Sequence, residues 1–113
     1  MSKIKVAIVD DHQLFREGIA SLLAKNEELE IVGEADSQTA FYELMESGTP
    51  HVVLMDISMP DISGLDLIRI ARDKYPLVKF IVLTMHAEGQ YVVKAVRNGA
   101  HGYLIKNADE QEL

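Results

Sequence analysis

Five side chains that can bind ions or transfer groups stand at or just after the ends of short apolar runs. They are Asp10, Asp11, Asp56, Thr84 and Lys106. Carboxylates can hold a cation or act as nucleophiles, while a lysine and a hydroxyl can bind an anion. If the apolar runs are parallel strands, these residues share one edge of the sheet, because the carboxyl ends of parallel strands meet there. We therefore expect one site built from distant segments.

The expected charges of this site indicate a bound cation. Three carboxylates within about 5 Å would repel each other by roughly 3 kcal/mol per pair at an effective dielectric constant near 20. Oxygen donors favour a hard ion such as Mg²⁺. Lys106 is suited to an incoming anion and Thr84 to one of its oxygens, so the set predicts a cradle for a phosphoryl group. His12, His51 and His101 are scattered along the sequence, and no metal role is assigned to them.

The elements that must position these residues follow from hydrophobic periodicity. Strands are predicted at 4–9, 30–35, 52–55, 79–83 and 102–105, and they alternate with helical patterns at 12–25, 37–47, 65–75 and 90–98. This alternation predicts an α/β fold with right-handed crossovers and a parallel sheet that is covered on both faces. The fifth helix amounts to about one turn at 109–113, so we expect a fragment of a longer parent protein.

Simple structural roles remain open for several of the candidate residues. Asp11 could cap the helix at 12–25, and Asp56 could accept hydrogen bonds from loop amides. Tyr103 could be a packing residue of its strand. After Asp56, Gly64 provides a backbone without side-chain bulk before the next helix.

Composition limits the class of protein. The 113 residues suffice for one domain with a core, and 48% hydrophobic with 26% charged residues is typical of a soluble globule. No apolar run approaches the roughly 20 residues that a membrane span needs, and no signal peptide is recognisable, so a cytoplasmic location is expected. The absence of cysteine excludes disulfides and thiolate chemistry, and the net charge of −7 disfavours direct nucleic-acid binding.

Four spaced features together carry a resemblance to a known family. They are Asp10-Asp11, Asp56 with Met59-Pro60 and Gly64, Leu83-Thr84, and the run from Gly102 to Lys106. From Ile4 onward the chain resembles the receiver domain of two-component response regulators. The segments Asp10 to Gly18 and Leu83 to His86 are similar to those of the NarL/FixJ subgroup, whose members usually carry a LuxR-type DNA-binding domain.

The resemblance implies a doubly wound, five-stranded parallel sheet with the flavodoxin-like (CheY-like) order 2-1-3-4-5. The whole of 1–113 would be a (βα)5 receiver domain with a truncated last helix. The parent would continue into a helix-turn-helix DNA-binding effector domain that is absent from this sequence. Phosphorylation would control that effector, and dimerisation of the phosphorylated parent is an expectation.

The resemblance also implies a role for each site residue. Asp56 would be the nucleophile and the modified residue, accepting a phosphoryl group from a histidine kinase. Mg²⁺, or Mn²⁺, would be held by Asp11, Asp56 and the backbone carbonyl of Ser58, with Asp10 binding a metal-bound water.

Three further implied residues would sense the phosphoryl group. Lys106 would pair with it, Thr84 would bond one of its oxygens, and Tyr103 would turn inward as the conformational switch. The chain would catalyse its own phosphorylation and dephosphorylation without being a turnover enzyme.

Three alternatives compete with this interpretation. A phosphohydrolase of the haloacid-dehalogenase kind would need an acid two residues after the nucleophile, where this sequence has Ser58. A flavodoxin-like cofactor module would need a phosphate-binding loop after the first strand, where Asp10 and Asp11 would repel a phosphate. A degenerate receiver that only makes protein contacts would not need the five site residues.

Overall fold

The computed structural model describes residues 3–57, 59, 62–84 and 100–105. These residues form strands β1 (Ile4–Val9), β2 (Leu29–Ala35), β3 (Val52–Asp56), β4 (Lys79–Thr84) and β5 (Gly102–Ile105), and helices α1 (Gln13–Leu23), α2 (Gln38–Ser47) and α3 (Gly64–Lys74). The helix expected at 90–98 and the helical turn expected at 109–113 lie outside the described residues.

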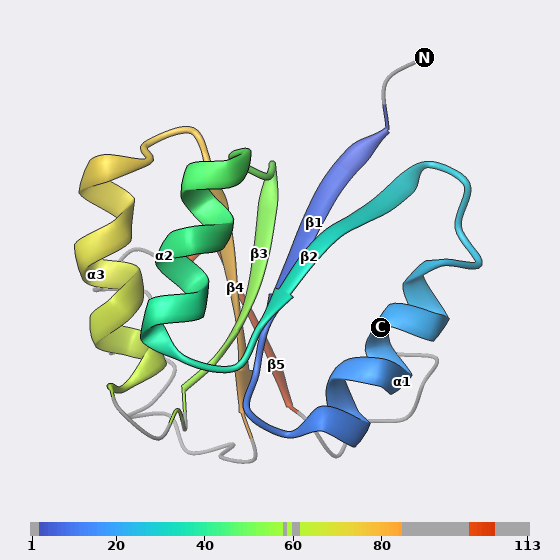
Figure 1. Cartoon of the computed structure of the whole chain (residues 1–113), viewed down its shortest axis with the longest axis horizontal. Helices are drawn as coiled ribbons and strands as arrows, with labels where there is room; N and C mark the ends of the chain where they lie inside the picture. Colours follow the sequence, from blue (N-terminus) through green and yellow to red (C-terminus); the bar gives the residue numbers. More distant parts are fainter. Residues whose placement is uncertain (1–2, 58, 60–61, 85–99, 106–113) are drawn as a thin grey trace.

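The strands form one parallel sheet in the order β2-β1-β3-β4-β5 (Figure 1). The apolar runs of β1, β3 and β4 become central strands because both of their faces are covered. In β2, at one edge of this sheet, partly buried and exposed residues alternate instead. The expected α/β class with a parallel sheet is confirmed.

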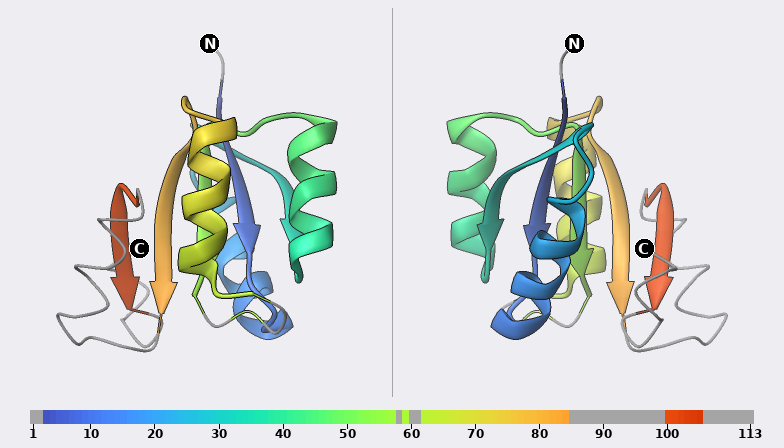
Figure 2. Two further views of the ribbon diagram at one scale, coloured as in Figure 1. Left: turned by 90° about the vertical axis from the view of Figure 1, so that its left-hand side faces the viewer. Right: turned by 90° about the vertical axis from the view of Figure 1, so that its right-hand side faces the viewer.

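Described helices cover both faces of the sheet (Figure 2). On the side of α2 and α3, the core includes Phe41, Ile68, Phe80 and Met55, all fully buried. On the side of α1, Ile19 packs with residues of β1, β3 and β4. Successive residues of a strand thus place their side chains in the cores on opposite faces of the sheet, because side chains alternate along a strand with a period of two.

Helix boundaries follow local capping chemistry. The hydroxyl of Ser37 accepts a hydrogen bond from the backbone N–H of Ala40, as expected for the start of the helix that we predicted at 37–47. At the start of α3, the hydroxyl of the N-cap residue Ser63 accepts a hydrogen bond from the backbone N–H of Leu65. Asp11 does not cap α1, which was the simple structural role left open for it. The N-cap position of α1 is His12, whose side chain makes no capping bond.

Two histidines join strand starts at the amino edge of the sheet. His51 Nδ1 accepts a hydrogen bond from the backbone N–H of Lys5 at 2.8 Å, and the His51 N–H donates to the Lys5 carbonyl at 2.9 Å. His101 Nδ1 accepts from the N–H of Phe80 at 3.2 Å. Both imidazoles therefore have structural roles at the edge opposite the strand tips.

An apolar cavity of about 250 Å³ lies on the α1 side of the sheet. Its lining includes Ile4 and Val6 of β1, Ile19 and Leu23 of α1, and Leu54 of β3.

In the part of the chain that the structure describes, no helix combines the length and apolar character needed to cross a bilayer.

Candidate functional site

The strands β1 and β3 bring the acidic residues together. They are parallel neighbours in which Val9 pairs with Met55, so the next residues, Asp10 and Asp56, emerge side by side at the carboxyl edge. Both carboxylates are enclosed, with side-chain exposures of 0% and 1%, whereas Asp11 is 30% exposed. The predicted convergence of the three acids is thus present in the structure.

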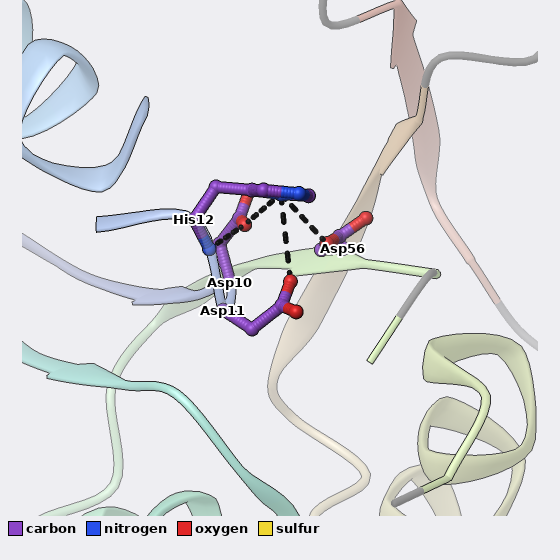
Figure 3. A group of neighbouring side chains, drawn as sticks. All are labelled: Asp10, Asp11, His12 and Asp56. Atoms are coloured by element: carbon purple, nitrogen blue, oxygen red, sulfur yellow. Dashed lines mark hydrogen bonds and ion pairs between the residues drawn. The ribbon is translucent and has the colours of Figure 1, made fainter. Parts of the chain in front are cut away.

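A histidine completes this acidic cluster. One ligand atom from each of Asp10, Asp11, His12 and Asp56 lies within 4.8 Å of all the others. His12 Nδ1 is 3.1 Å from Asp10 Oδ1, 3.4 Å from Asp11 Oδ1 and 3.8 Å from Asp56 Oδ2 (Figure 3). The sequence interpretation assigned no metal role to His12, although its position directly after two acids at a strand tip was a usable signal.

The donor set suits a small cation. Three carboxylates from two segments concentrate negative charge at the carboxyl edge of the sheet, and two of these carboxylates are shielded from solvent. The backbone N–H of His12 donates to Asp10 Oδ1 at 2.8 Å, which offsets part of this charge. A divalent ion bound by these oxygens would offset far more, because it would add two positive charges at direct-contact distance.

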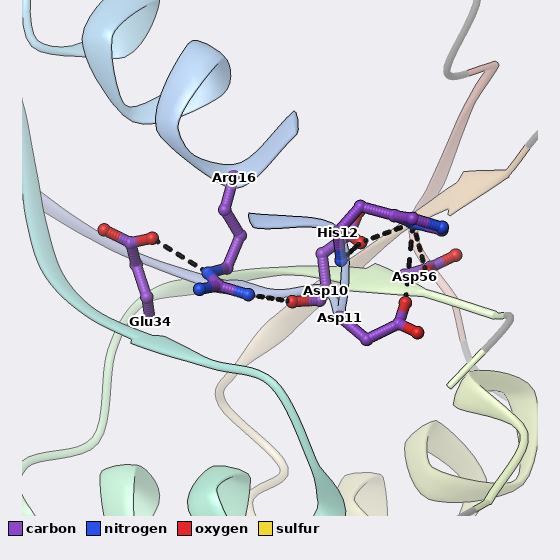
Figure 4. A network of polar contacts seen from close by, with 6 residues as sticks. All are labelled: Asp10, Asp11, His12, Arg16, Glu34 and Asp56. Carbon is purple, nitrogen blue, oxygen red and sulfur yellow. Dashed lines mark hydrogen bonds and ion pairs between the residues drawn. The ribbon is translucent and has the colours of Figure 1, made fainter. Parts of the chain in front are cut away.

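Arg16 secures the β1 tip that carries Asp10 and Asp11. It lies in the second turn of α1, and its Nη1 donates to the backbone carbonyl of Asp10 at 2.6 Å. Its Nε donates to Glu34 Oε1 of β2 at 3.1 Å (Figure 4). The Arg16 side chain is only 16% exposed, so a single guanidinium joins helix α1 to the ends of two strands.

Backbone contacts hold the tip of β3 just as closely. The N–H of Ile57 donates to the carbonyl of Leu83 at 3.2 Å, and the N–H of Gly64 donates to the carbonyl of Ile57 at 3.1 Å. A Cβ atom on Gly64 would overlap the carbonyl oxygen of Asp56 and would lie 2.8 Å from Ile57 Cα. The expectation that Gly64 serves by its lack of bulk therefore has a specific cause.

The remaining predicted site residues are only partly described. Thr84 is the last residue of β4, and its backbone pairs with Ile105 of β5. Tyr103 pairs with Val82 in the same ladder. Strand register thus places Thr84 on the carboxyl edge that also carries Asp56, whose partner in β4 is Leu83. Ser58 and Lys106 lie outside the described residues.

Comparison with known proteins assigns this arrangement to a family. The family model described as the response regulator receiver domain matches residues 6–113. This chain is a member of that family. The transcriptional regulatory protein DegU of Brevibacillus brevis is 42% identical to the receiver domain over 112 residues, which are 99% of this chain and 48% of that protein.

Solved structures agree with this assignment. A two-component response regulator of the LuxR family from Aurantimonas sp. SI85-9A1 superposes with a TM-score of 0.91 at 32% identity, covering 98% of the receiver domain and 79% of that chain. A CheY-like receiver domain protein from Methanospirillum hungatei gives a TM-score of 0.84 at 25% identity, covering 98% and 87%. The expected resemblance to LuxR-type response regulators and the CheY-like fold class are confirmed.

The receiver domain spans about half the length of the curated relatives that it matches. Several of these relatives are named as transcriptional regulators.

Proposed function

We propose that this receiver domain is a phosphorylation switch that accepts a phosphoryl group from a histidine kinase on Asp56. The observation that carries this proposal is the meeting of Asp10, Asp11 and Asp56 at the carboxyl edge of the sheet. Asp56 is the acid that ends the central strand β3, so its carboxylate is held in a fixed position at that edge. A fixed, enclosed carboxylate beside a cation site is suited to nucleophilic attack on phosphorus.

The residues present fit a divalent cation, Mg²⁺ or Mn²⁺. Asp11 and Asp56 would bind it directly with the backbone carbonyl of Ser58, and Asp10 would hold one of its waters. All three carboxylates offer an oxygen within 4.8 Å of the others, close to the roughly 4.2 Å that separates opposite ligands of an ion with bonds of about 2.1 Å. When bound, the ion supplies positive charge that offsets repulsion between the carboxylates and the incoming phosphoryl group.

The chain's own residues then carry the transfer. An oxygen of Asp56 attacks the phosphorus of a phosphohistidine, the P–N bond breaks, and its electron pair stays with the kinase imidazole. Lys106 pairs with the transferred group, and Thr84 donates a hydrogen bond to one of its oxygens. The domain would also assist hydrolysis of the resulting acyl phosphate, so it is a phosphoacceptor and not a turnover enzyme.

The phosphoryl group would bias a two-state element. It replaces one carboxylate charge with a dianionic group, which favours whichever loop arrangement brings Thr84 and Lys106 close. Tyr103 would turn inward with Thr84. A coupling of about 1 to 3 kcal/mol between the site and the surface is the usual scale for such switches.

At the level of the parent protein, 1–113 would be the receiver of a cytoplasmic transcriptional regulator. Several matched relatives are named as transcriptional regulators, and the receiver domain covers about half of their length. A C-terminal DNA-binding domain would account for the half of these relatives that the receiver domain does not match. Phosphorylation would control that domain, with dimerisation as the expected means.

Labelling with a small phosphodonor tests the nucleophile. Acetyl phosphate with Mg²⁺ should add one phosphoryl group to the wild-type chain, and Asp56→Asn should abolish the addition because the amide is a poor nucleophile. Intact mass spectrometry measures it. Asp73→Asn is the matched control, since Asp73 is 85% exposed on α3, and it should label like the wild type. Undiminished labelling of Asp56→Asn would exclude this nucleophile.

A further inference from the structure

His12 is the member of the cluster to which the proposed phosphoryl transfer assigns no role. We propose that His12 is a nitrogen ligand of the bound cation and that it shifts the site's preference from Mg²⁺ toward first-row transition ions such as Zn²⁺ and Co²⁺. This inference rests on the proposed function, because it takes the carboxylate cluster to be the cation site.

The distances around His12 Nδ1 match those between neighbouring ligands of one ion. In a six-coordinate site with bonds of about 2.1 Å, adjacent ligand atoms are about 3.0 Å apart and opposite ones about 4.2 Å apart. His12 Nδ1 lies 3.1, 3.4 and 3.8 Å from oxygens of the three aspartates, between these two limits. The imidazole nitrogen can therefore occupy one vertex of a coordination polyhedron whose other vertices include the carboxylates.

The ring's position makes ligation accessible. The His12 side chain is 58% exposed, yet its Nδ1 faces all three acids (Figure 3). It makes no capping bond to α1, and the backbone N–H of His12 already contacts Asp10. With the ring proton on Nε2, the Nδ1 lone pair would be available to an ion that replaces the direct contact between His12 and Asp10.

Donor chemistry then predicts the selectivity. Mg²⁺ prefers oxygen ligands and keeps several waters, so it gains little from an imidazole. Zn²⁺, Co²⁺ and Ni²⁺ accept imidazole nitrogen readily and bind mixed nitrogen and oxygen sites more tightly. A set of three carboxylates and one imidazole should therefore hold these ions more strongly than the three carboxylates alone.

Calorimetric titration of the metals alone tests the proposal. The ratio of Co²⁺ affinity to Mg²⁺ affinity should fall about tenfold or more in His12→Gln and in His12→Ala, the scale on which lost metal-site contacts act. His101→Gln is the matched control: His101 lies at the opposite edge of the sheet and bonds Phe80 of β4, away from the strands that carry the acids, so its replacement should leave the ratio unchanged. Circular dichroism confirms that each variant is folded.

Paramagnetic NMR gives a direct structural readout. Co²⁺ should shift one imidazole resonance of the wild type far outside the normal range, and that resonance should be missing from His12→Gln. An unchanged affinity ratio, or a shifted imidazole signal that persists in His12→Gln, would overturn the assignment.

Variants of the aspartates distinguish failure of the His12 proposal from failure of the proposed function. If Asp11→Asn weakens both ions but His12→Gln leaves the affinity ratio unchanged, the cation site stands and the nitrogen ligand is rejected. If Asp11→Asn and Asp56→Asn leave the affinity for both ions unchanged, the acidic cluster is not the cation site, and both proposals fall.

Discussion

Gly64 lets the last residue of β3 touch the first turn of α3. The site that would receive a Cβ at this position is taken by the carbonyl oxygen of Asp56. Any larger residue must therefore displace the backbone that carries the proposed nucleophile. A position in the first turn of a helix, where most residue types are tolerated, is here restricted to glycine by a contact with another strand.

Gly64→Ala is expected to lower the free energy of unfolding by about 1 to 3 kcal/mol, the usual cost of overpacking. It should also slow labelling by acetyl phosphate, because the Asp56 carbonyl must move. Urea denaturation followed by circular dichroism measures the first effect, and intact mass the second. Gly18→Ala is the matched control: among the described residues, no atom beyond the adjoining helix backbone lies within 4 Å of its added Cβ, and alanine favours a helix by up to about 1 kcal/mol. Equal stability changes at both glycines would contradict the overlap.

Residue-level prediction succeeded where strand topology decides the outcome. The meeting of Asp10, Asp11 and Asp56 follows from parallel strands alone, so it could be predicted without knowing any side-chain conformation. The position of His12 could not. It depends on the turn after β1, where His12 has φ −91° and ψ 99°, and this turn directs the ring back over the acids. Thr84, Tyr103, Ser58 and Lys106 keep their assigned roles as predictions.

At the scale of elements, α1 is joined to the sheet by one partly buried guanidinium as well as by apolar packing. Arg16 bonds the Asp10 carbonyl at the end of β1 and Glu34 in β2. The sequence showed the apolar face of α1, and Ile19 is indeed buried. It did not show the link made by Arg16, because Glu34 is 18 residues away and its register with β1 is known only from the folded sheet.

Arg16→Ala should lower the free energy of unfolding by about 1.5 to 3 kcal/mol, the scale for a hydrogen bond that involves a charged group. It should also weaken cation binding, since the Asp10-Asp11 tip loses its support. Chemical denaturation and calorimetry measure the two effects.

The control for this prediction is Arg72→Ala. Arg72 is 41% exposed and approaches an exposed Asp73 at 3.8 Å, so its loss should cost no more than about 0.5 kcal/mol. Comparable losses from both arginine variants would show that Arg16 has no special structural role.

At the scale of the whole molecule, fold stability and cation binding should be linked. The acids belong to two segments that meet only in the folded chain, so an ion bound between them favours the folded state. The same topology explains why the fold class was predictable: five apolar runs separated by helical patterns leave few arrangements open. The helix boundaries needed local detail, as the start of α1 at Gln13 after an uncapped His12 shows.

Adding Mg²⁺ at a hundredfold excess over its dissociation constant should stabilise the wild-type chain by about 2.7 kcal/mol. Differential scanning calorimetry should show this as a rise of several degrees in the unfolding midpoint, which EDTA reverses. Asp11→Asn should lose most of the rise because a direct ligand is gone. If the midpoint of Asp11→Asn rises as much as that of the wild type, the cation binds elsewhere.

The histidine joint between β1 and β3 has a consequence for the distant acids. His51 fixes the start of β3 against Lys5 through both its backbone and its imidazole. A slip of this pairing by one residue would carry Asp10 about 3.3 Å along the strand axis and would turn its side chain to the opposite face of the sheet. The His51 imidazole therefore helps to set the register of β1 and β3, and with it the alignment of the carboxylates. It does so from the far end of β3, about 17 Å from the acids, the length of a five-residue strand.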